Sequence, residues 1–163
     1  MTSDGSKVSN ELFRRAWSMF PTGVTVVTAD VAMGGQTHCM TANAVCSVSL
    51  DPMLVLVSIA HSGSTNAVVR RIGRYGLNFL GSHQTGVAVE HASMDGVRVA
   101  PPGHRAHPEG ALLLDDAVVS MDCAVVETVE VGDHTLFIGR VEAIEIQEGA
   151  PLVFHKGKFT ALS

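Results

Sequence analysis

Runs of β-branched and aliphatic residues dominate the chain after its first twenty positions. Such runs, bounded by Gly, Pro, Asn and Asp, are typical of β-strands. The expected strands cover residues 23–28, 37–48, 53–59, 76–80, 118–129 and 134–146. The chain is therefore predicted to be rich in strands.

Helical periodicity occurs in only three segments. Ser9 is placed to cap a first helix over residues 10–19, whose apolar residues Leu12, Phe13, Ala16 and Met19 share one face. Ser64 is expected to cap a second helix over residues 65–74, and a weaker pattern covers residues 85–92.

Turn signals link neighbouring strands and indicate the topology. Val131-Gly132-Asp133 is typical of a hairpin connection, and the Pro-rich and Gly-rich residues 93–110 are expected to form a long surface loop. Because strands do not alternate with helices, the pattern disfavours a doubly wound parallel sheet. It predicts a mainly β protein, a closed or nearly closed antiparallel barrel with a few peripheral helices.

Length, charge and hydropathy narrow the class of protein. A chain of 163 residues suits one domain, preceded here by a polar N-terminal tail at residues 1–10. The net charge of −5 and the lack of a basic segment argue against nucleic acid as a partner. The longest apolar runs are about five residues, against the roughly 20 that a membrane-spanning helix needs. Without a signal-peptide pattern either, a cytoplasmic protein that makes no membrane contact is expected.

Cysteine and histidine spacing does not favour a metal site. Cys39, Cys46 and Cys123 form no Cys-x-x-Cys pair and are expected to be reduced thiols. His104 and His107 are three residues apart, but they lie in a Pro-rich and Gly-rich stretch rather than on a helix. No metal is expected.

Polar positions inside apolar runs are the first candidates for ligand binding. With the period of a strand, Thr41, Asn43, Ser47 and Ser49 share one face. That face suits either hydrogen bonding to the rim of a planar heterocycle or contact with solvent. The Thr22-Gly23 step offers a second, weaker candidate, because glycine allows a ligand to approach the backbone closely.

Two further segments have the chemistry of a site. Residues 59–66 leave a strand and enter a helix through small hydroxyl residues, a layout suited to a phosphate or to a helix cap without a ligand. His134 follows the Gly132-Asp133 turn and is held at the start of a strand, a placement that suits either a site residue or an ordinary turn residue. The sequence lacks a Gly-x-Ser-x-Gly elbow and a Gly-x-Gly-x-x-Gly fingerprint, so neither a hydrolase nor a Rossmann cofactor site is supported.

Taken in order, several segments resemble the flavin reductase family, the small components of two-component flavin-dependent monooxygenases. The matching segments are Phe20-Pro21-Thr22-Gly23-Val24-Thr25-Val26-Val27-Thr28, Met40-Thr41-Ala42-Asn43-Ala44, Ser47-Val48-Ser49-Leu50-Asp51-Pro52, Asn78-Phe79-Leu80, Gly132-Asp133-His134-Thr135-Leu136-Phe137-Ile138-Gly139-Arg140-Val141, and Pro151-Leu152-Val153-Phe154-His155 with Gly157. The resemblance implies a flavin reductase-like domain over residues 11–163. This sequence departs from the family pattern at Cys39, Cys46 and Met53. It also has no aromatic residue in the 93–110 segment.

The resemblance implies a split β-barrel of the FMN-binding type, a homodimer, and reduction of FMN or FAD by NADH or NADPH for a partner monooxygenase. FMN is the first choice, because the 62–65 segment offers a site for one terminal phosphate. Two alternatives remain on the same fold: a flavin carrier or sensor without turnover, and a flavoenzyme that acts on another small molecule.

The resemblance also implies roles for individual residues. His134 would orient the nicotinamide over the flavin. The implied flavin-binding residues are Thr41, Ala42 and Asn43 at the ring, Ser47, Val48 and Ser49 along the adjoining chain, and Ser62, Ser64 and Thr65 at the phosphate. Thr22 is a further implied flavin-binding residue.

Overall fold

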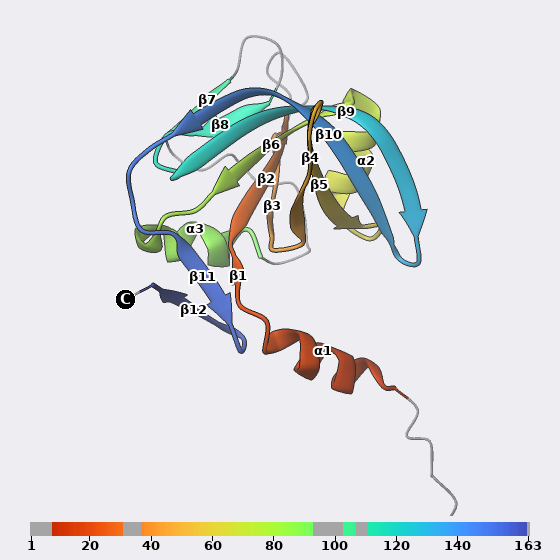
Figure 1. Cartoon of the computed structure of the whole chain (residues 1–163), viewed down its shortest axis with the longest axis vertical. Coiled ribbons are helices and arrows are strands. Elements are labelled where there is room, and N and C mark those ends of the chain that lie inside the picture. Colours follow the sequence, from red (N-terminus) through yellow and green to blue (C-terminus); the bar gives the residue numbers. More distant parts are fainter. Residues whose placement is uncertain (1–7, 31–36, 93–102, 107–110, 163) are drawn as a thin grey trace, which may run out of the picture.

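The computed structural model describes residues 8–30, 37–92, 103–106 and 111–162 (Figure 1). The elements are α1 (Asn10–Ser18), β1 (Thr22–Gly23), β2 (Thr25–Asp30), β3 (Thr37–Ala42), β4 (Val45–Leu50), β5 (Met53–Ala60), α2 (Ser64–Ile72), β6 (Arg74–Phe79), η1 (Ser82–Gln84), α3 (Thr85–Glu90), β7 (His104–Ala106), β8 (Leu112–Leu114), β9 (Val119–Val131), β10 (His134–Ile146), β11 (Leu152–His155) and β12 (Lys158–Ala161). Among the described helices, none is both long and apolar enough to cross a membrane.

The main sheet has seven strands in the order β3-β2-β6-β9-β10-β5-β4. Its edge strands β3 and β4 follow one another in the chain and are separated only by Asn43 and Ala44. Two residues cannot span a flat seven-stranded sheet, so the sheet curls until its edges approach. Among the described residues β3 and β4 form no ladder with each other, so a seam remains between these two strands. The hydrogen bond from Ser58 N–H to Ala44 O at 3.0 Å extends the β4–β5 pairing on one side of this seam. The predicted mainly β, split-barrel fold is confirmed.

The barrel encloses an aliphatic and aromatic core. Tyr75 on β6 and Phe137 on β10 are fully buried there, and the buried Val68 and Val69 of α2 close one side. Gly139 lets Tyr75 fit, because a Cβ at Gly139 would lie closer than 3 Å to the Tyr75 ring. A second apolar cluster fills the space between β2, α3, β8 and β11.

A buried asparagine joins four strands beside that second cluster. Asn78 Nδ2 donates to Val26 O at 3.1 Å. Its Oδ1 accepts from Leu114 N at 2.8 Å and from Ser120 Oγ at 3.0 Å. The side chain therefore connects β6 to β2, β8 and β9.

Local signals in the sequence predict several elements well. The first helix begins after Ser9, whose Oγ accepts from Leu12 N at 3.1 Å. The β9–β10 hairpin turns at Gly132 with φ +59°, a conformation that favours glycine. Both features match the sequence-based expectation.

Three expectations are wrong. Residues 37–48 form two strands instead of one, because the chain passes from one edge of the curled sheet to the other at Asn43-Ala44. The cap of α2 is Gly63, and Ser64 is the first helical residue. The expected loop at 93–110 contains β7, which pairs with β8, while residues 93–102 and 107–110 lie outside the described part of the chain.

The N-terminal tail predicted at residues 1–10 is only partly described. Residues 1–7 lie outside the described part of the chain, and Asn10 already belongs to α1.

Candidate functional site

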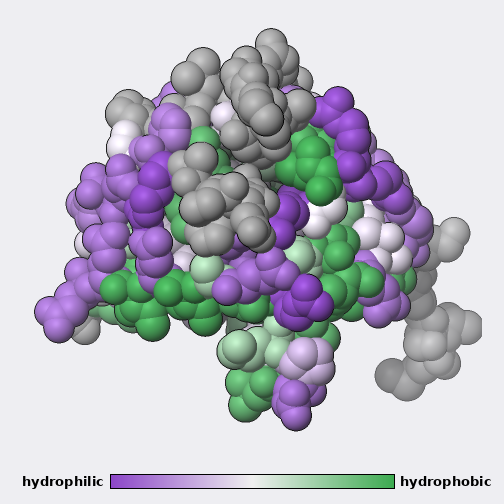
Figure 2. Space-filling model, turned by 90° about the horizontal axis from the view of Figure 1, so that it is seen from above, coloured by the Kyte–Doolittle hydropathy of each residue, from purple (hydrophilic) through white to green (hydrophobic). Residues whose placement is uncertain are grey.

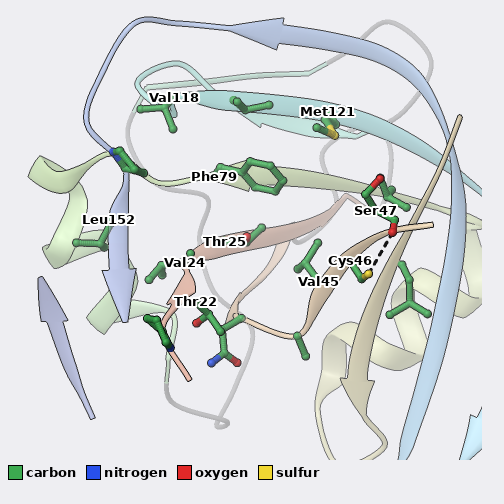
Figure 3. Close-up of a pocket in the computed structure, with 18 of the residues that line it drawn as sticks. Thr22, Val24, Thr25, Val45, Cys46, Ser47, Phe79, Val118, Met121 and Leu152 are labelled. Carbon is green, nitrogen blue, oxygen red and sulfur yellow. Dashed lines mark hydrogen bonds between the residues drawn. The ribbon is translucent and has the colours of Figure 1, made fainter. Parts of the chain in front are cut away.

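A cavity of about 1000 Å³ opens beside the seam of the barrel. Figure 3 shows Thr22, Val45, Phe79 and Leu152 around this hollow, contributed by β1, β4, β6 and β11. The volume matches the upper end of the ~300–1,000 Å³ range of small-molecule sites. The cavity is large enough for a planar heterocycle with a polar chain attached.

The cavity wall is mainly apolar, with a few polar groups placed among the aliphatic side chains. Asn43 and Ser47 lie on the wall, and Ser58 faces it from β5. The Thr22 hydroxyl is buried at the wall, and it has no hydrogen-bond partner within the described part of the chain. Buried polar atoms are nearly always paired, so this hydroxyl suits a ligand that offers a polar atom.

The structure brings three of the predicted flavin-binding residues, Thr22, Asn43 and Ser47, to this cavity. Thr41 is not among the lining residues, and its Oγ1 donates to Ala88 O at 2.7 Å. Ala42 is buried in β3 and pairs with Thr25 of β2.

Val48 and Ser49 lie on β4 beyond the cavity wall. The β4–β5 pairing changes register between Ser47 and Ser49, so the expected alternation is interrupted at this point. The prediction that Thr41, Asn43, Ser47 and Ser49 share one strand face is therefore wrong. The break at Asn43-Ala44 and this bulge separate them.

The three predicted phosphate residues lie together at the start of α2, outside the cavity lining. Ser62 is exposed in the turn before the helix, and Thr65 is buried in its first turn. Ser64 Oγ lies 3.1 Å from His38 Nδ1. Burial, and then the charge of Arg71, lowers the pKa of His38, so a neutral imidazole faces the serine.

His134 lies at the first position of β10, opposite Ala60 at the end of β5. Its Nδ1 is 2.7 Å from Asp133 Oδ1, and this hydrogen bond holds the pKa of Asp133 below its ordinary value. His61 N–H donates to Asp133 O at 2.9 Å, which ties the β9–β10 turn to the segment that contains Ser62. The histidine and the phosphate candidates therefore share one end of the barrel.

A polar cluster that the sequence did not indicate lies at the same end. Glu130 accepts from Arg70, and its Oε2 is 2.7 Å from His61 Nε2. The hydrogen bond from Arg70 holds the pKa of Glu130 below its ordinary value. Arg70 also donates to Thr135 Oγ1 at 2.9 Å. These residues come from α2, from both strands of the β9–β10 hairpin and, for His61, from the turn between β5 and α2, so no local pattern reveals them.

Two aromatic residues at the cavity mouth were also missed. Trp17 belongs to α1 and Phe20 follows it, and both line the cavity although neither is buried. The sequence pattern indicated an apolar helix face of Leu12, Phe13, Ala16 and Met19, and it did not single out Trp17 or Phe20 as site residues. Among the described residues no group of three or more His, Cys, Asp or Glu side chains could hold a metal ion.

Comparison with known proteins gives a consistent result. The pattern of the flavin reductase like domain matches residues 17–163. An NADH-dependent FMN reductase, AsuE2 of Streptomyces nodosus subsp. asukaensis, is 40% identical over 168 residues, covering 97% of this chain and 88% of the relative.

Solved structures agree. Flavin reductase PheA2 in its native state superposes with a TM-score of 0.87 at 37% identity, over 96% of this chain and 99% of that one. The styrene monooxygenase flavin reductase of Pseudomonas putida S12 gives 0.81 at 33% identity, over 93% and 97%.

Proposed function

Because the chain belongs to the flavin reductase like domain family, we propose that it is an NADH-dependent flavin reductase that supplies reduced flavin to a separate monooxygenase. The observation that carries the proposal is the similarity to an NADH-dependent FMN reductase across nearly the whole chain. The similarity to the reductase of styrene monooxygenase supports a two-component system. The chain is accordingly an oxidoreductase.

The residues at the cavity fit a flavin. The Asn43 amide can both donate to and accept from a heterocycle, and the unpaired Thr22 hydroxyl offers another polar contact. Apolar walls from Val45, Phe79 and Leu152 suit the faces of a tricyclic ring and exclude water from it. When bound, a flavin supplies the redox chemistry by accepting a hydride from the nicotinamide.

The protein contributes positioning rather than acid or base catalysis. Holding two rings in contact removes much of the entropic cost of bringing them together. Positioning of this kind needs no carboxylate, and the described lining residues include none. Thr41, Ala42, Ser47, Val48 and Ser49 stay proposed contacts along the β3–β4 side of the flavin.

The flavin phosphate is proposed to bind at the start of α2. Ser62, Ser64 and Thr65 carry hydroxyls there, and the first backbone N–H groups of the nine-residue helix favour an anion. FMN remains the first choice of flavin because it presents a single terminal phosphate, and FAD is the alternative. NADPH is the alternative to NADH as the electron donor. Tighter binding of FAD than of FMN in parallel titrations would reverse the order.

His134 is proposed to orient the nicotinamide. Its hydrogen bond to Asp133 fixes the ring at the end of β10 and leaves Nε2 to meet a ligand. Loss of such positioning can cost ~100-fold in rate without dissolving the resting complex. His134→Ala should therefore slow flavin reduction far more than it weakens flavin binding. Normal reduction kinetics at saturating NADH would remove His134 from the mechanism.

We propose that residues 11–163 form the flavin reductase-like domain. The protein is proposed to be a homodimer and to reside in the cytoplasm. Support comes from a small split barrel whose edge strand β4 and cavity mouth carry exposed apolar side chains. Nucleic acid and membranes are not proposed as partners.

The direct test is steady-state NADH oxidation, followed by absorbance, with FMN present and absent. Turnover should require the protein, NADH and FMN together. A rate no faster than that of free FMN with NADH would overturn the reductase assignment.

A further inference from the structure

The position of His134 depends on what holds the start of β10. The hydrogen bond with Asp133 orients the His134 ring, but Asp133 belongs to the same turn and its side chain is 94% exposed. This pair therefore moves with the turn and does not anchor it to the barrel. His134 is also the first residue of its strand, and the ends of strands open easily unless further contacts hold them.

The next residue, Thr135, supplies such contacts through its hydroxyl group. Thr135 is fully buried. Its Oγ1 accepts from Asn66 Nδ2 at 3.0 Å and from Arg70 Nη2 at 2.9 Å. It also lies 3.3 Å from Glu130 Oε2, to which its proton can be donated. A hydroxyl has two lone pairs and one proton, so its full hydrogen-bonding capacity is used here.

The two groups that donate to Thr135 come from one face of α2. Asn66 and Arg70 are four residues apart, which places them on the same side of the helix. Asn66 Nδ2 also donates to Ile59 O at 2.9 Å, and Ile59 is the residue of β5 that pairs with Thr135. The Arg70 guanidinium lies over the ring of Phe137, 6.0 Å from its centroid. The helix is therefore joined to the first residues of β10 by specific contacts.

Burial makes these polar contacts specific. Hydrophilic side chains spread over much of the outer surface in Figure 2, whereas Asn66 and Thr135 are buried between α2 and β10, which lie side by side in Figure 1. A fully paired buried polar group favours one arrangement of the elements that it joins, because other arrangements leave a donor or an acceptor unpaired. The Thr135 hydroxyl thus fixes β10 relative to α2 more narrowly than apolar packing would.

We propose that Thr135 is a positioning residue for His134, because its hydroxyl fixes the backbone from which the imidazole reaches the nicotinamide. The inference rests on the proposed reductase function and on the proposed role of His134. Successive side chains of a strand point to opposite faces, so Thr135 and His134 leave β10 in opposite directions. Thr135 therefore acts through the backbone and not by contact with the nicotinamide.

Thr135→Val is the variant that isolates the hydroxyl. Valine keeps the shape and β-branching of threonine. Asn66 retains Ile59 O as an acceptor and Arg70 retains Glu130, so neither donor loses its last partner. The start of β10 then moves more freely relative to α2, and the imidazole spends less time in the productive position.

Three companion variants separate positioning from general stability. Thr135→Ser restores the hydroxyl. Arg70→Met removes one of the links from α2 at a residue whose side chain is 47% exposed, so this variant is expected to fold. Thr28→Val is the matched control, because Thr28 is also fully buried, its hydroxyl donates to Leu112 O, and it is not among the described cavity-lining residues.

FMN affinity, stopped-flow flavin reduction over a range of NADH concentrations, and amide hydrogen exchange are measured on each folded variant. Thr135→Val should reduce flavin ~10-fold more slowly at limiting NADH while keeping its FMN affinity. Exchange at residues 131–136 should become faster in the same variant. Arg70→Met should change both quantities in the same direction. Thr135→Ser should behave as the wild type, and Thr28→Val should lose stability without either change.

A double variant shows whether Thr135 acts through His134. In the His134→Ala background, Thr135→Val should lower the reduction rate no further, because the group that it positions is already gone. A second full loss in that background would overturn the proposal. A loss of equal size in Thr28→Val or Thr135→Ser would overturn it too, as would unchanged reduction kinetics in Thr135→Val and Arg70→Met.

Failure of the reductase assignment gives a different result. A wild type that binds FMN but does not accelerate its reduction by NADH would refute the assignment by itself. Hydrogen exchange then still decides the proposed link: faster exchange at residues 131–136 in Thr135→Val supports it, and unchanged exchange overturns it.

Discussion

Replacing Asn78 by alanine should destabilise the protein by about 2–4 kcal/mol. Asn78 is fully buried and connects β6 to β2, β8 and β9 through its side-chain amide. Alanine leaves the N–H of Leu114 and the hydroxyl of Ser120 without this acceptor, and each buried unsatisfied group costs ~1–3 kcal/mol. Ser120 can turn fully toward Leu114 O, already 3.2 Å away, which reduces its share. The Leu114 N–H has no second acceptor in this hydrogen-bond network.

Urea denaturation followed by circular dichroism measures this loss, with the m-value checked for two-state behaviour. Asn43→Ala is the matched control, because Asn43 is exposed at the cavity wall and should contribute to flavin affinity rather than to stability. A loss below ~1 kcal/mol for Asn78→Ala, or an equal loss for Asn43→Ala, would refute the reasoning from buried hydrogen bonds.

Three further results are expected. Cys46 is exposed, whereas burial raises the pKa of Cys123 to about 12. A thiol reagent at pH 8 should therefore modify Cys46 at once and Cys123 only after unfolding. Rapid modification of Cys123 in the folded protein would contradict its burial. Hydrogen bonds from Arg140 and then Arg74 hold the pKa of Glu142 below its ordinary value. The ionised Glu142 therefore stabilises the fold above about pH 4.3, and this stabilisation is lost as the pH falls through the lowered pKa of Glu142. Arg140→Gln should make the free energy of unfolding depend less on pH in that acid range. An unchanged pH dependence would show that the Arg140–Glu142 pair contributes no stability.

The sequence predicted the elements whose signals are local. The β10 strand was predicted with both its boundaries, because regular apolar positions follow a turn that requires the positive φ of Gly132. The first helix was predicted because Ser9 caps it through a contact only three residues away. The split-barrel class followed from strand order and from the family resemblance.

The sequence could not predict features that depend on distant contacts. The break at Asn43-Ala44 arises because a curled sheet brings its two edges together, and the alternating polar residues show no interruption there. Ser64 resembled a helix cap, yet its hydroxyl pairs with His38, 26 residues earlier. The ion pair of Arg70 with Glu130 spans 60 positions and has no local signature.

The candidate site was predicted in part for the same reason. Thr22, Asn43 and Ser47 reach the cavity, and their contact with flavin stays a prediction. The sequence pattern did not single out Trp17 or Phe20 as site residues, and only the three-dimensional arrangement places them at the cavity mouth.

Anaerobic stopped-flow mixing of NADH with the protein and FMN tests the central claim most directly, because it isolates hydride transfer to the flavin from later reaction with oxygen. The oxidised-flavin absorbance should fall at a rate that rises with protein concentration and greatly exceeds that of free FMN with NADH. Loss of absorbance at the uncatalysed rate, from a folded protein that binds FMN, would show a flavin-binding protein without reductase activity and contradict the account.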